Sequence, residues 1–426
     1  MRPRVLVLGG GFAGLSCALA LPASRFAVTL VDQSPSFEFL PAIHELVSGL
    51  KRPAELRLPL KPVLAREGHR FRRGEVVAID SAARRVQFAK GSLRYDILVV
   101  AVGAADADFG VSGVREHAMP FKSVAQCAAI GRRLRSLLRE PRPGRVTIVG
   151  GGLEGVECLG EVLRVRGDRD FPVTLVEAGP RLLPGAPAPV GRHLAAHCEA
   201  AGVELLCGEA VERVTAKTVK LAGGRRLRSA LTIWTGGPAP RPLLAESGLA
   251  APGRWAAVAD NLRLEGADDV FVAGDSGELP QPLARQAYHA LAMGRHCARE
   301  IERAERGRAP RAFRPAEKPQ LIAFGERDCV LLQGRHALAS PKRLSRCWPP
   351  RTSNRSYSMA PNPTQPLATL KRAWHSYATA LAISSSPSAV ARPMTAPRAS
   401  PYARPMADRL PTTRAWTAPP SHKCHW

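Results

Sequence analysis

The 426 residues exceed what one hydrophobic core accommodates and predict two or three domains, while the lack of any apolar stretch long enough to cross a bilayer excludes a transmembrane helix. The nine cysteines form no C-x-x-C pair and no metal-ligand spacing, which predicts reduced thiols in the cytoplasm and no metal site. The net charge of +25 does not indicate nucleic-acid binding, because about half of it lies beyond Pro341 and no aromatic-basic platform accompanies it.

A glycine motif near the N-terminus predicts the first ligand site. The apolar run Val5–Leu8 has the character of a buried parallel strand, and G-x-G-x-x-G, a small-residue helix ending at Pro22 and a second strand, Phe26–Val31, follow it. The glycines allow a tight turn, close approach of a pyrophosphate to the helix N-terminus and close helix–strand packing, while the acid after the second strand accepts ribose hydroxyls. This order predicts a dinucleotide site, with an ordinary glycine-rich turn as the alternative. The residues expected to contact the dinucleotide are Gly9, Gly11, Phe12, Ala13, Gly14 and Asp32.

The following segments complete one βαβ unit with an antiparallel excursion. Ser34–Leu60 is a proline-rich connection with a short helix expected near residues 42–49, and Ala125–Arg139 has helical periodicity. Apolar or alternating runs predict strands at Gly74–Asp80, Arg85–Ala89 and Tyr95–Ala104.

The same motif then occurs a second time. The strand Arg145–Val149, the helix Val156–Arg166 and the strand Pro172–Val176 repeat the first unit. One chain with two such folds predicts two different dinucleotides with electrons passing between them, and a duplication with one inactive site is the alternative. The residues expected at the second dinucleotide are Gly150, Gly152, Gly155 and Glu177.

The rest of the chain up to residue 340 predicts a second sheet region, a long helix and a hairpin. We expect helices at Gly191–Ala201 and from about Pro282 to Arg306, strands at Val203–Leu206, Val211–Leu221, Leu231–Gly237 and Asp269–Asp275, and a hairpin at Leu321–Gly334. The predicted domains are residues 1–110 and 241–340 for one dinucleotide fold, 111–240 for the other, and a tail at 341–426.

The ordered set of motifs resembles the FAD-dependent pyridine nucleotide oxidoreductases with two dinucleotide-binding folds, and within them the type II NADH dehydrogenase-like group. The resemblance covers about residues 3–340 and is carried by both glycine motifs with their acids, the strand ending at Gly103, the segment Trp234–Gly237 and the strand Val270–Asp275. It implies an α/β protein of two Rossmann-like, doubly wound domains, the second inserted in the first.

The resemblance also implies roles for individual residues. The first fold binds FAD, with further contacts at Val77, Gly103, Gly274 and Asp275. The second binds NADH, with a further contact at Gly236, and Glu177 disfavours the 2′-phosphate of NADPH, a preference that nearby Arg181 softens. Glu157 lies near the junction of nicotinamide and flavin and is the candidate catalytic residue.

The implied reaction is hydride transfer from NADH to flavin and electron transfer on to a quinone-like small molecule. No cysteine pair suits a dithiol relay, and Tyr288 and Ala292 replace the glutamines of the family's quinone motif. Cys158 falls where sulfide:quinone reductases hold a redox cysteine, with Cys127 or Cys329 as partner, although a buried packing residue is the preferred interpretation. His44, His289 and His296 are interpreted as surface or packing residues, with proton transfer as an alternative for His289.

The tail from residue 341 holds 14 prolines and four of the six tryptophans, which predicts a disordered segment. Leu367, Leu370, Trp374, Tyr377 and Leu381 have the spacing of an amphipathic membrane-surface helix, and a shifted reading frame is the preferred alternative. Because the first strand begins within a few residues of the N-terminus, we expect no signal peptide. The expected location is cytoplasmic, with peripheral contact to the inner membrane face, and the expected assembly is a homodimer.

Other functions stay open at this point. The same fold serves sulfide:quinone reductase-like enzymes and reductases of small redox proteins. A catalytically impaired cofactor-binding protein with an altered C-terminus is the remaining alternative.

Overall fold

The computed structural model describes residues 2–339 and 415–416 of the chain, and these fall into two compact units. Unit 1 comprises residues 2–139 and 233–316, and unit 2 comprises residues 140–232, 317–339 and 415–416. Within these described residues, every helix is too short or too polar to cross a bilayer.

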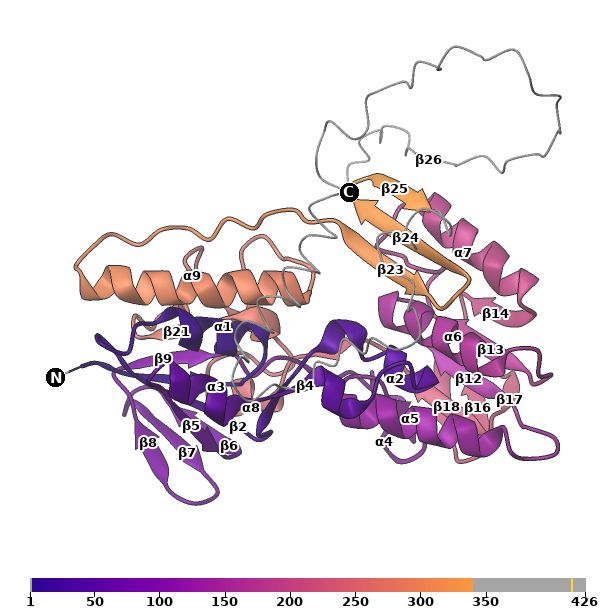
Figure 1. The fold of residues 1–426 in the computed structure, drawn as a ribbon, viewed down its shortest axis with the longest axis horizontal. Coiled ribbons are helices and arrows are strands. Elements are labelled where there is room, and N and C mark those ends of the chain that lie inside the picture. Colours follow the sequence, from indigo (N-terminus) through magenta and orange to yellow (C-terminus); the bar gives the residue numbers. More distant parts are fainter. Residues whose placement is uncertain (1, 340–414, 417–426) are drawn as a thin grey trace, which may run out of the picture. The chain divides into compact units, whose positions relative to one another are not determined.

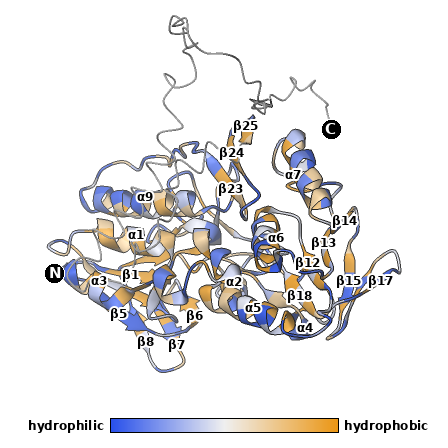
Figure 2. Ribbon diagram, turned by 45° about the vertical axis from the view of Figure 1, so that its right-hand side comes forward, coloured by the Kyte–Doolittle hydropathy of each residue, from blue (hydrophilic) through white to orange (hydrophobic). Residues whose placement is uncertain are grey.

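Unit 1 is built on a parallel five-stranded sheet with the order β21-β9-β1-β2-β5. Its strands are β1 (Arg4–Leu8), β2 (Ala27–Asp32), β5 (Arg70–Arg73), β9 (Ile97–Val100) and β21 (Val270–Val272). These short strands are mostly apolar, because helices cover the sheet. The helices of this sheet are α1 (Phe12–Ala20), α3 (Leu60–Arg66) and α9 (Ala287–Glu305). Figure 1 shows α9 lying along α1, and Figure 2 shows the apolar character of β1 beside the hydrophilic outer side of α9.

Small residues allow α1 and α9 to pack closely. A Cβ added at Gly294 would lie 2.0 Å from the carbonyl oxygen of Ala13, and the Ser16 hydroxyl donates to the carbonyl of Leu291 at 3.0 Å. The last long helix of unit 1 therefore rests directly on the helix that follows the first glycine motif.

A three-stranded antiparallel meander lies between β5 and β9 in the chain: β6 (Val76–Asp80), β7 (Arg85–Phe88) and β8 (Ser92–Arg94). The remaining helices of unit 1 are α2 (Glu45–Ser48), α4 (Val114–His117), α5 (Val124–Leu137) and α8 (Pro242–Glu246). Its short strands are β3 (Ser36–Glu38), β4 (Arg57–Pro59), β10 (Ala105–Asp106), β11 (Met119–Pro120), β19 (Pro238–Ala239), β20 (Ala256–Ala257) and β22 (Gly277–Glu278), and 3₁₀ turns occupy Leu40–Ala42, Pro53–Leu56 and Gly274–Ser276.

Unit 2 repeats this plan. Its parallel strands are β12 (Val146–Val149), β13 (Val173–Glu177), β14 (Val203–Cys207) and β18 (Leu231–Trp234), in a sheet of order β11-β18-β12-β13-β14. The unit boundary falls inside β18, whose last two residues pair with β11 within unit 1. Helices α6 (Leu153–Arg166) and α7 (Ala188–Ala200) connect its strands, and a second meander, β15 (Val211–Val214), β16 (Thr218–Leu221) and β17 (Arg226–Arg228), precedes β18. A separate antiparallel sheet holds β23 (Gln320–Phe324), β24 (Asp328–Gln333), β25 (His336–Ala339) and β26 (Ala415–Trp416). The predicted pair of Rossmann-like folds is confirmed.

The compact units divide the chain differently from the predicted domain ranges. Residues 111–139 fall in unit 1, because α5 packs on α2: a Cβ at Gly131 would lie 2.6 Å from the carbonyl oxygen of Leu46, and the Val124 amide donates to Glu38 at 2.9 Å. Residues 317–339 fall in unit 2, because Gly325 lies against Gly160 of α6. The cofactor assigned to each range stays a prediction.

Some elements differ in length from their predictions. The long helix begins at Ala287 rather than near Pro282, because the backbone of Gln286 is extended and the residues before it are not helical. The short helix near 42–49 is one turn, Glu45–Ser48, that ends at left-handed Gly49. The predicted amphipathic helix at 367–381 and the rest of the tail segment up to 414 lie outside the described residues.

Candidate functional site

The first glycine motif forms the turn between β1 and α1 in unit 1. Gly9 has φ +102°, its amide donates to the carbonyl of Val31 at 2.8 Å, and an added Cβ would lie 2.1 Å from the carbonyl oxygen of Ala101. A Cβ at Gly14 would lie 1.9 Å from the carbonyl oxygen of Gly9. Both positions require glycine, because a side chain would collide with backbone atoms.

Gly11 differs from these two glycines. It precedes the first turn of α1 in an extended conformation, no side chain caps the helix, and an added Cβ would meet no atom within 4 Å. The free amides at the start of α1 therefore face open space beside the glycine backbone, which is the arrangement that binds a pyrophosphate. Ala13 and Phe12 belong to this first turn, and Phe12 packs edge-on against Phe37 at 4.9 Å between ring centroids.

The carboxylate of Asp32 is held at the end of β2. The Gly10 amide donates to its Oδ2 at 2.6 Å, and the Ser34 amide donates to its Oδ1 at 2.7 Å. Each oxygen keeps a lone pair for another donor, so two vicinal hydroxyls of a ribose fit this carboxylate.

A second carboxylate of unit 1 lies where β21 ends. Gly274 has φ +69° and brings the chain against the first turn of α1, since its added Cβ would lie 3.0 Å from the Cβ of Ala13. Burial raises the pKa of Asp275, while the positive charges of Arg285 and Lys122 oppose this shift. Among the described residues no side chain or amide donates a hydrogen bond to the Asp275 carboxylate, which fits a site for a ligand hydroxyl.

Asp275 forms part of the wall of a pocket between β21 and α9. The wall also includes Glu278, Leu283, Arg285, His289 and Met293. The Arg285 guanidinium stacks over the ring of Trp255 at 3.5 Å, and its Nε donates to the carbonyl of Asp275 at 3.3 Å. The α9 side of the pocket thus presents Ala290 and Met293 beside His289, and the other side carries two acids, Asp275 and Glu278, with one arginine, Arg285.

Three histidines that the sequence interprets as surface or packing residues are buried. His289 Nδ1 donates to the carbonyl of Ala284 at 2.8 Å, and His296 Nε2 donates to the carbonyl of Arg311 at 3.0 Å. His44 is buried beside α2. Packing is the role that the described contacts of His44 and His296 support, whereas His289 also borders the pocket.

The second glycine motif, in unit 2, has nearly the same geometry. Gly150 has φ +110°, and its amide donates to the carbonyl of Val176 at 2.8 Å. Gly152 precedes α6 without a capping side chain, and its added Cβ would also meet no atom within 4 Å. Gly155 is buried in the first turn of α6.

Glu177 takes the place that Asp32 has in unit 1. The amide of Gly151 donates to Glu177 Oε2 at 2.5 Å, and the amide of Gly179 donates to Oε1 at 2.6 Å. The carboxylate is thus fixed at the end of β13 with its outer lone pairs available, and its negative charge disfavours a phosphate at the same position.

Arg181 is engaged by its own loop. Its guanidinium donates to the carbonyls of Leu182, Leu183, Pro184 and Ala186 at 2.7–3.3 Å. A 2′-phosphate would have to compete with these four bonds. The structure therefore gives Arg181 a role in ordering the loop after β13.

Glu157, the predicted catalytic residue, lies on α6 and is partly buried. Its Oε1 accepts a hydrogen bond from the Ala323 amide of β23 at 3.4 Å. Its neighbour Cys158 is fully buried, and burial raises the pKa of this thiol well above its ordinary value. No disulfide joins Cys158 to Cys127 or to Cys329 among the described residues, and Cys127 belongs to the other unit.

The structure brings most, but not all, of the predicted site residues into two groups. The predicted FAD residues are all in unit 1, where Ser276 donates to the carbonyl of Gly103 at 3.3 Å. Val77 is 54% exposed at a bulge of β6. Gly236 falls in unit 1, whereas the other predicted NADH residues fall in unit 2, and its added Cβ would lie 2.6 Å from Trp234 Nε1.

One cluster was not predicted. His193 and His197 of α7 meet Asp328 of β24 in unit 2. The H-x-x-x-H spacing was a visible signal, because residues i and i+4 share one face of a helix. The partner carboxylate, far along the chain, carries no such signal.

Comparisons with known proteins agree with this geometry. The sequence model described as pyridine nucleotide-disulphide oxidoreductase matches residues 3–294. A type II NADH:quinone oxidoreductase of Staphylococcus aureus is 26% identical over 358 residues, covering 77% of this chain and 89% of the relative. The corresponding protein of Staphylococcus haemolyticus is 27% identical over the same length.

Solved structures share the fold at low sequence identity. NDH2 from Plasmodium falciparum in complex with NADH matches with a TM-score of 0.76 at 16% identity, covering 82% of this chain and 93% of that one. The sulfide:quinone oxidoreductase of Aquifex aeolicus matches with a TM-score of 0.71 at 20% identity, covering 80% of this chain and 87% of that one.

Proposed function

The chain belongs to the pyridine nucleotide-disulphide oxidoreductase family, and from this premise we propose that it transfers a hydride from NADH to FAD and passes the electrons to a quinone-like acceptor. FAD and a pyridine nucleotide are its cofactors. The main observation behind the proposal is the pair of glycine turns. Beside each turn, two backbone amides donate hydrogen bonds to one carboxylate.

The residues of unit 1 suit FAD. The start of α1 would bind the pyrophosphate, Asp32 would accept the ribose hydroxyls, and Asp275 would accept a hydroxyl of the ribityl chain. FAD, when bound, supplies the hydride-accepting and electron-donating chemistry, and the protein supplies position and electrostatics.

The residues of unit 2 suit NADH rather than NADPH. The start of α6 would bind the pyrophosphate and Glu177 the ribose hydroxyls, where its charge repels a 2′-phosphate. Since the Arg181 guanidinium donates to four carbonyls, a 2′-phosphate would have to break these bonds to pair with it. Glu157 is the proposed residue beside the nicotinamide, with its carboxylate oriented by the Ala323 amide.

A quinone is the proposed acceptor because the relatives of highest sequence similarity quoted above are named NADH:quinone oxidoreductases. Tyr288 and Ala292 stand where the family's quinone motif has glutamines, so any quinone contacts in the α9 pocket differ, and Asp275, Glu278, Arg285 and His289 are polar groups of its wall. We also propose a peripheral location at the inner membrane face, because quinones dissolve in the bilayer. A homodimer is also proposed.

The test is one anaerobic experiment followed by one kinetic comparison. The flavin absorbance of the purified protein should bleach on addition of NADH and respond much less to NADPH. NADH oxidation should then proceed with a menaquinone analogue as well as with ferricyanide. Bleaching with ferricyanide activity but no quinone activity would overturn the acceptor, and a flavin that NADH does not reduce would overturn the whole proposal.

Membrane contact is tested separately. The full chain should float with vesicles that contain anionic lipid and remain unbound to purely zwitterionic ones. Flotation with neither composition would contradict the peripheral location.

A further inference from the structure

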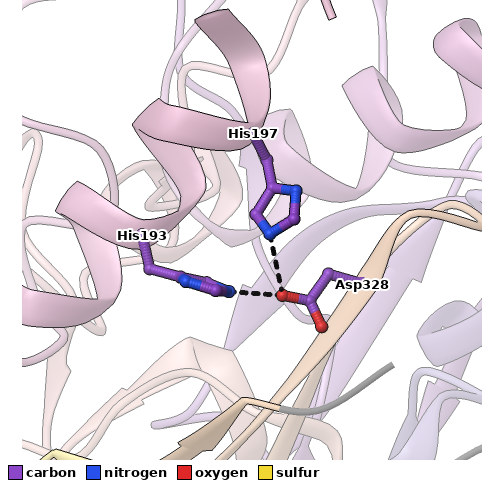
Figure 3. A group of neighbouring side chains, drawn as sticks. All are labelled: His193, His197 and Asp328. Carbon is purple, nitrogen blue, oxygen red and sulfur yellow. Dashed lines mark hydrogen bonds and ion pairs between the residues drawn. The ribbon is translucent and has the colours of Figure 1, made fainter. Parts of the chain in front are cut away.

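Unit 2 holds a cluster of metal-ligand side chains outside both glycine motifs. His193 and His197 project from one face of α7 toward Asp328, the first residue of β24, as Figure 3 shows. One candidate ligand atom from each residue can be chosen so that all lie within 4.8 Å of one another. None of these residues belongs to the dinucleotide motif or to the proposed hydride transfer.

The convergence has a simple structural cause. The two histidines are four residues apart, so one turn of helix separates them on the same face, and their rings pack edge-on with centroids 4.7 Å apart. Asp328 is placed opposite Phe324 in the β23–β24 hairpin, and the Phe324 ring lies 6.3 Å from that of His197. The hairpin therefore presents its acid to the helix at a fixed position.

The two oxygens of Asp328 have different partners. Oδ1 accepts a hydrogen bond from the amide of Cys329 at 2.7 Å, which orients the carboxylate. Oδ2 faces both imidazoles: His197 Nε2 lies 3.3 Å away, and His193 Nε2 pairs with the same oxygen. The Asp328 side chain is 1% exposed, while those of His193 and His197 are 23% and 32% exposed.

This donor set and its exposure suit a divalent transition metal. Two imidazole nitrogens and one carboxylate oxygen are ligands of Zn²⁺, at bond lengths of about 2.0–2.2 Å that place tetrahedral ligand atoms about 3.3–3.6 Å apart. The distance between His197 Nε2 and Asp328 Oδ2, 3.3 Å, already lies in this range. His193 needs only to withdraw from the carboxylate, and the exposed side leaves room for water as a fourth ligand. Metal-binding carboxylates are commonly oriented by a hydrogen bond from a neighbouring group, and the bond from the Cys329 amide to Asp328 Oδ1 is of this kind.

We propose that His193 Nε2, His197 Nε2 and Asp328 Oδ2 bind one Zn²⁺ ion, which ties the β23–β24 hairpin to α7. The other side of this hairpin lies against α6, where Gly325 contacts Gly160 and the Ala323 amide bonds to Glu157. The metal would thus hold in place the hairpin that orients Glu157. The proposal does not depend on the electron acceptor or on hydride transfer.

The test uses the full chain, treated with a chelator and dialysed, with Zn²⁺ alone as the probe. Calorimetric titration of the wild-type protein should show one site per chain. His193→Gln and His197→Gln should each weaken binding by more than tenfold, since even loss of an outer-shell partner costs about 10–100-fold. His117→Gln, at an exposed histidine of α4, is the matched control and should bind as the wild type does.

Cobalt distinguishes this site from the cysteines of the same unit. Co²⁺ added to the wild-type protein should give the weak visible bands of a tetrahedral nitrogen–oxygen site, without the near-ultraviolet absorption of a thiolate ligand. Flavin content and far-ultraviolet circular dichroism of the metal-free variants show whether they are folded.

Three results would overturn the proposal. The first is that the wild-type protein binds no Zn²⁺ in the micromolar range. The second is that the double variant His193→Gln/His197→Gln binds Zn²⁺ as the wild type does, and the third is a cobalt spectrum typical of a thiolate site. The first and third results need no variant, so the proposal is decided even where a variant fails to fold.

Discussion

The two glycine turns of this chain are nearly the same in their backbone and differ in what covers them. Gly9 and Gly150 have φ +102° and +110°, and Gly11 and Gly152 have ψ −166° and −168°. In both units a three-stranded meander separates the third and fourth parallel strands in the chain. A local motif therefore produces the same pyrophosphate cradle twice.

The surroundings of the two helices are different. In unit 1, α9 and the end of β21 press on the first turn of α1 through Gly294 and Gly274. In unit 2, α6 meets the β23–β24 hairpin nearly two turns further along, at Gly160, and the loop after β13 is ordered by Arg181. The comparison teaches that the motif provides a dinucleotide site, while the covering elements decide how firmly the dinucleotide is enclosed.

The largest effect is expected from Gly14→Ala and Gly294→Ala, which attack the close packing of α1. The added Cβ atoms would lie 1.9 Å and 2.0 Å from backbone oxygens, and overpacking costs about 1–3 kcal/mol or more where backbone must move. We expect loss of FAD and a clear fall in Tm by circular dichroism. Gly11→Ala, whose Cβ meets nothing within 4 Å, is the control and should lose FAD affinity without a large fall in Tm. A Tm of Gly14→Ala within about 2 °C of the wild type would contradict the packing argument.

The two acids should separate the two cofactors. Asp32→Asn is expected to lower the flavin content, whereas Glu177→Gln should keep the flavin and raise KM for NADH by about 10–100-fold, because hydrogen bonds to a charged group contribute about 1.5–3 kcal/mol. The measurements are flavin absorbance per chain and steady-state kinetics. Loss of flavin from Glu177→Gln would show that the units are not assigned to the cofactors as proposed.

Asp275→Asn should have a smaller effect. We expect it to raise the stability of the flavin-free protein and to weaken FAD binding. Burial raises the pKa of this carboxyl, so the folded protein favours its protonated form; folding stability is greatest below the unfolded-state pKa and falls as pH rises through the folded-state pKa. At pH 7 the amide variant should therefore have a higher Tm without flavin, by about 2–4 °C for each kcal/mol, and weaker FAD binding. A lower Tm of the flavin-free variant across pH 5–8 would contradict this.

Cys158→Ala should have the smallest effect on turnover. Because the thiol is buried and its pKa is raised, it is not a redox nucleophile, and the variant should keep the rate of flavin reduction within about twofold while losing about 1–2 kcal/mol of stability. Stopped-flow reduction by NADH checks the rate. A loss of activity with sulfide or NADH of more than tenfold would restore the redox interpretation of this residue.

Much of the candidate site was predictable because the motif is local. The strand, glycine turn, helix and terminal acid of each unit lie within a few tens of residues, and only a narrow set of backbone conformations satisfies their spacing, as the collisions at Gly9 and Gly14 show. Each terminal acid lies at the end of its strand and accepts a hydrogen bond from its own glycine turn.

The parts that were not predictable depend on segments distant in sequence. Arg181 sits close to Glu177 in the chain, yet its bonds to the loop could not be inferred from proximity. The assignment of residues 317–339 to unit 2 follows from the contact of Gly325 with Gly160. The sequence around either glycine does not predict this contact.

By itself the sequence determined that this chain has two dinucleotide folds, because glycine spacing and strand hydrophobicity act over short distances. Only the tertiary structure decided that α9 covers α1 and that Asp328 meets His193 and His197. The reason is physical: a pairwise contact between remote segments depends on the packing of everything between them, and no periodicity along the chain records it.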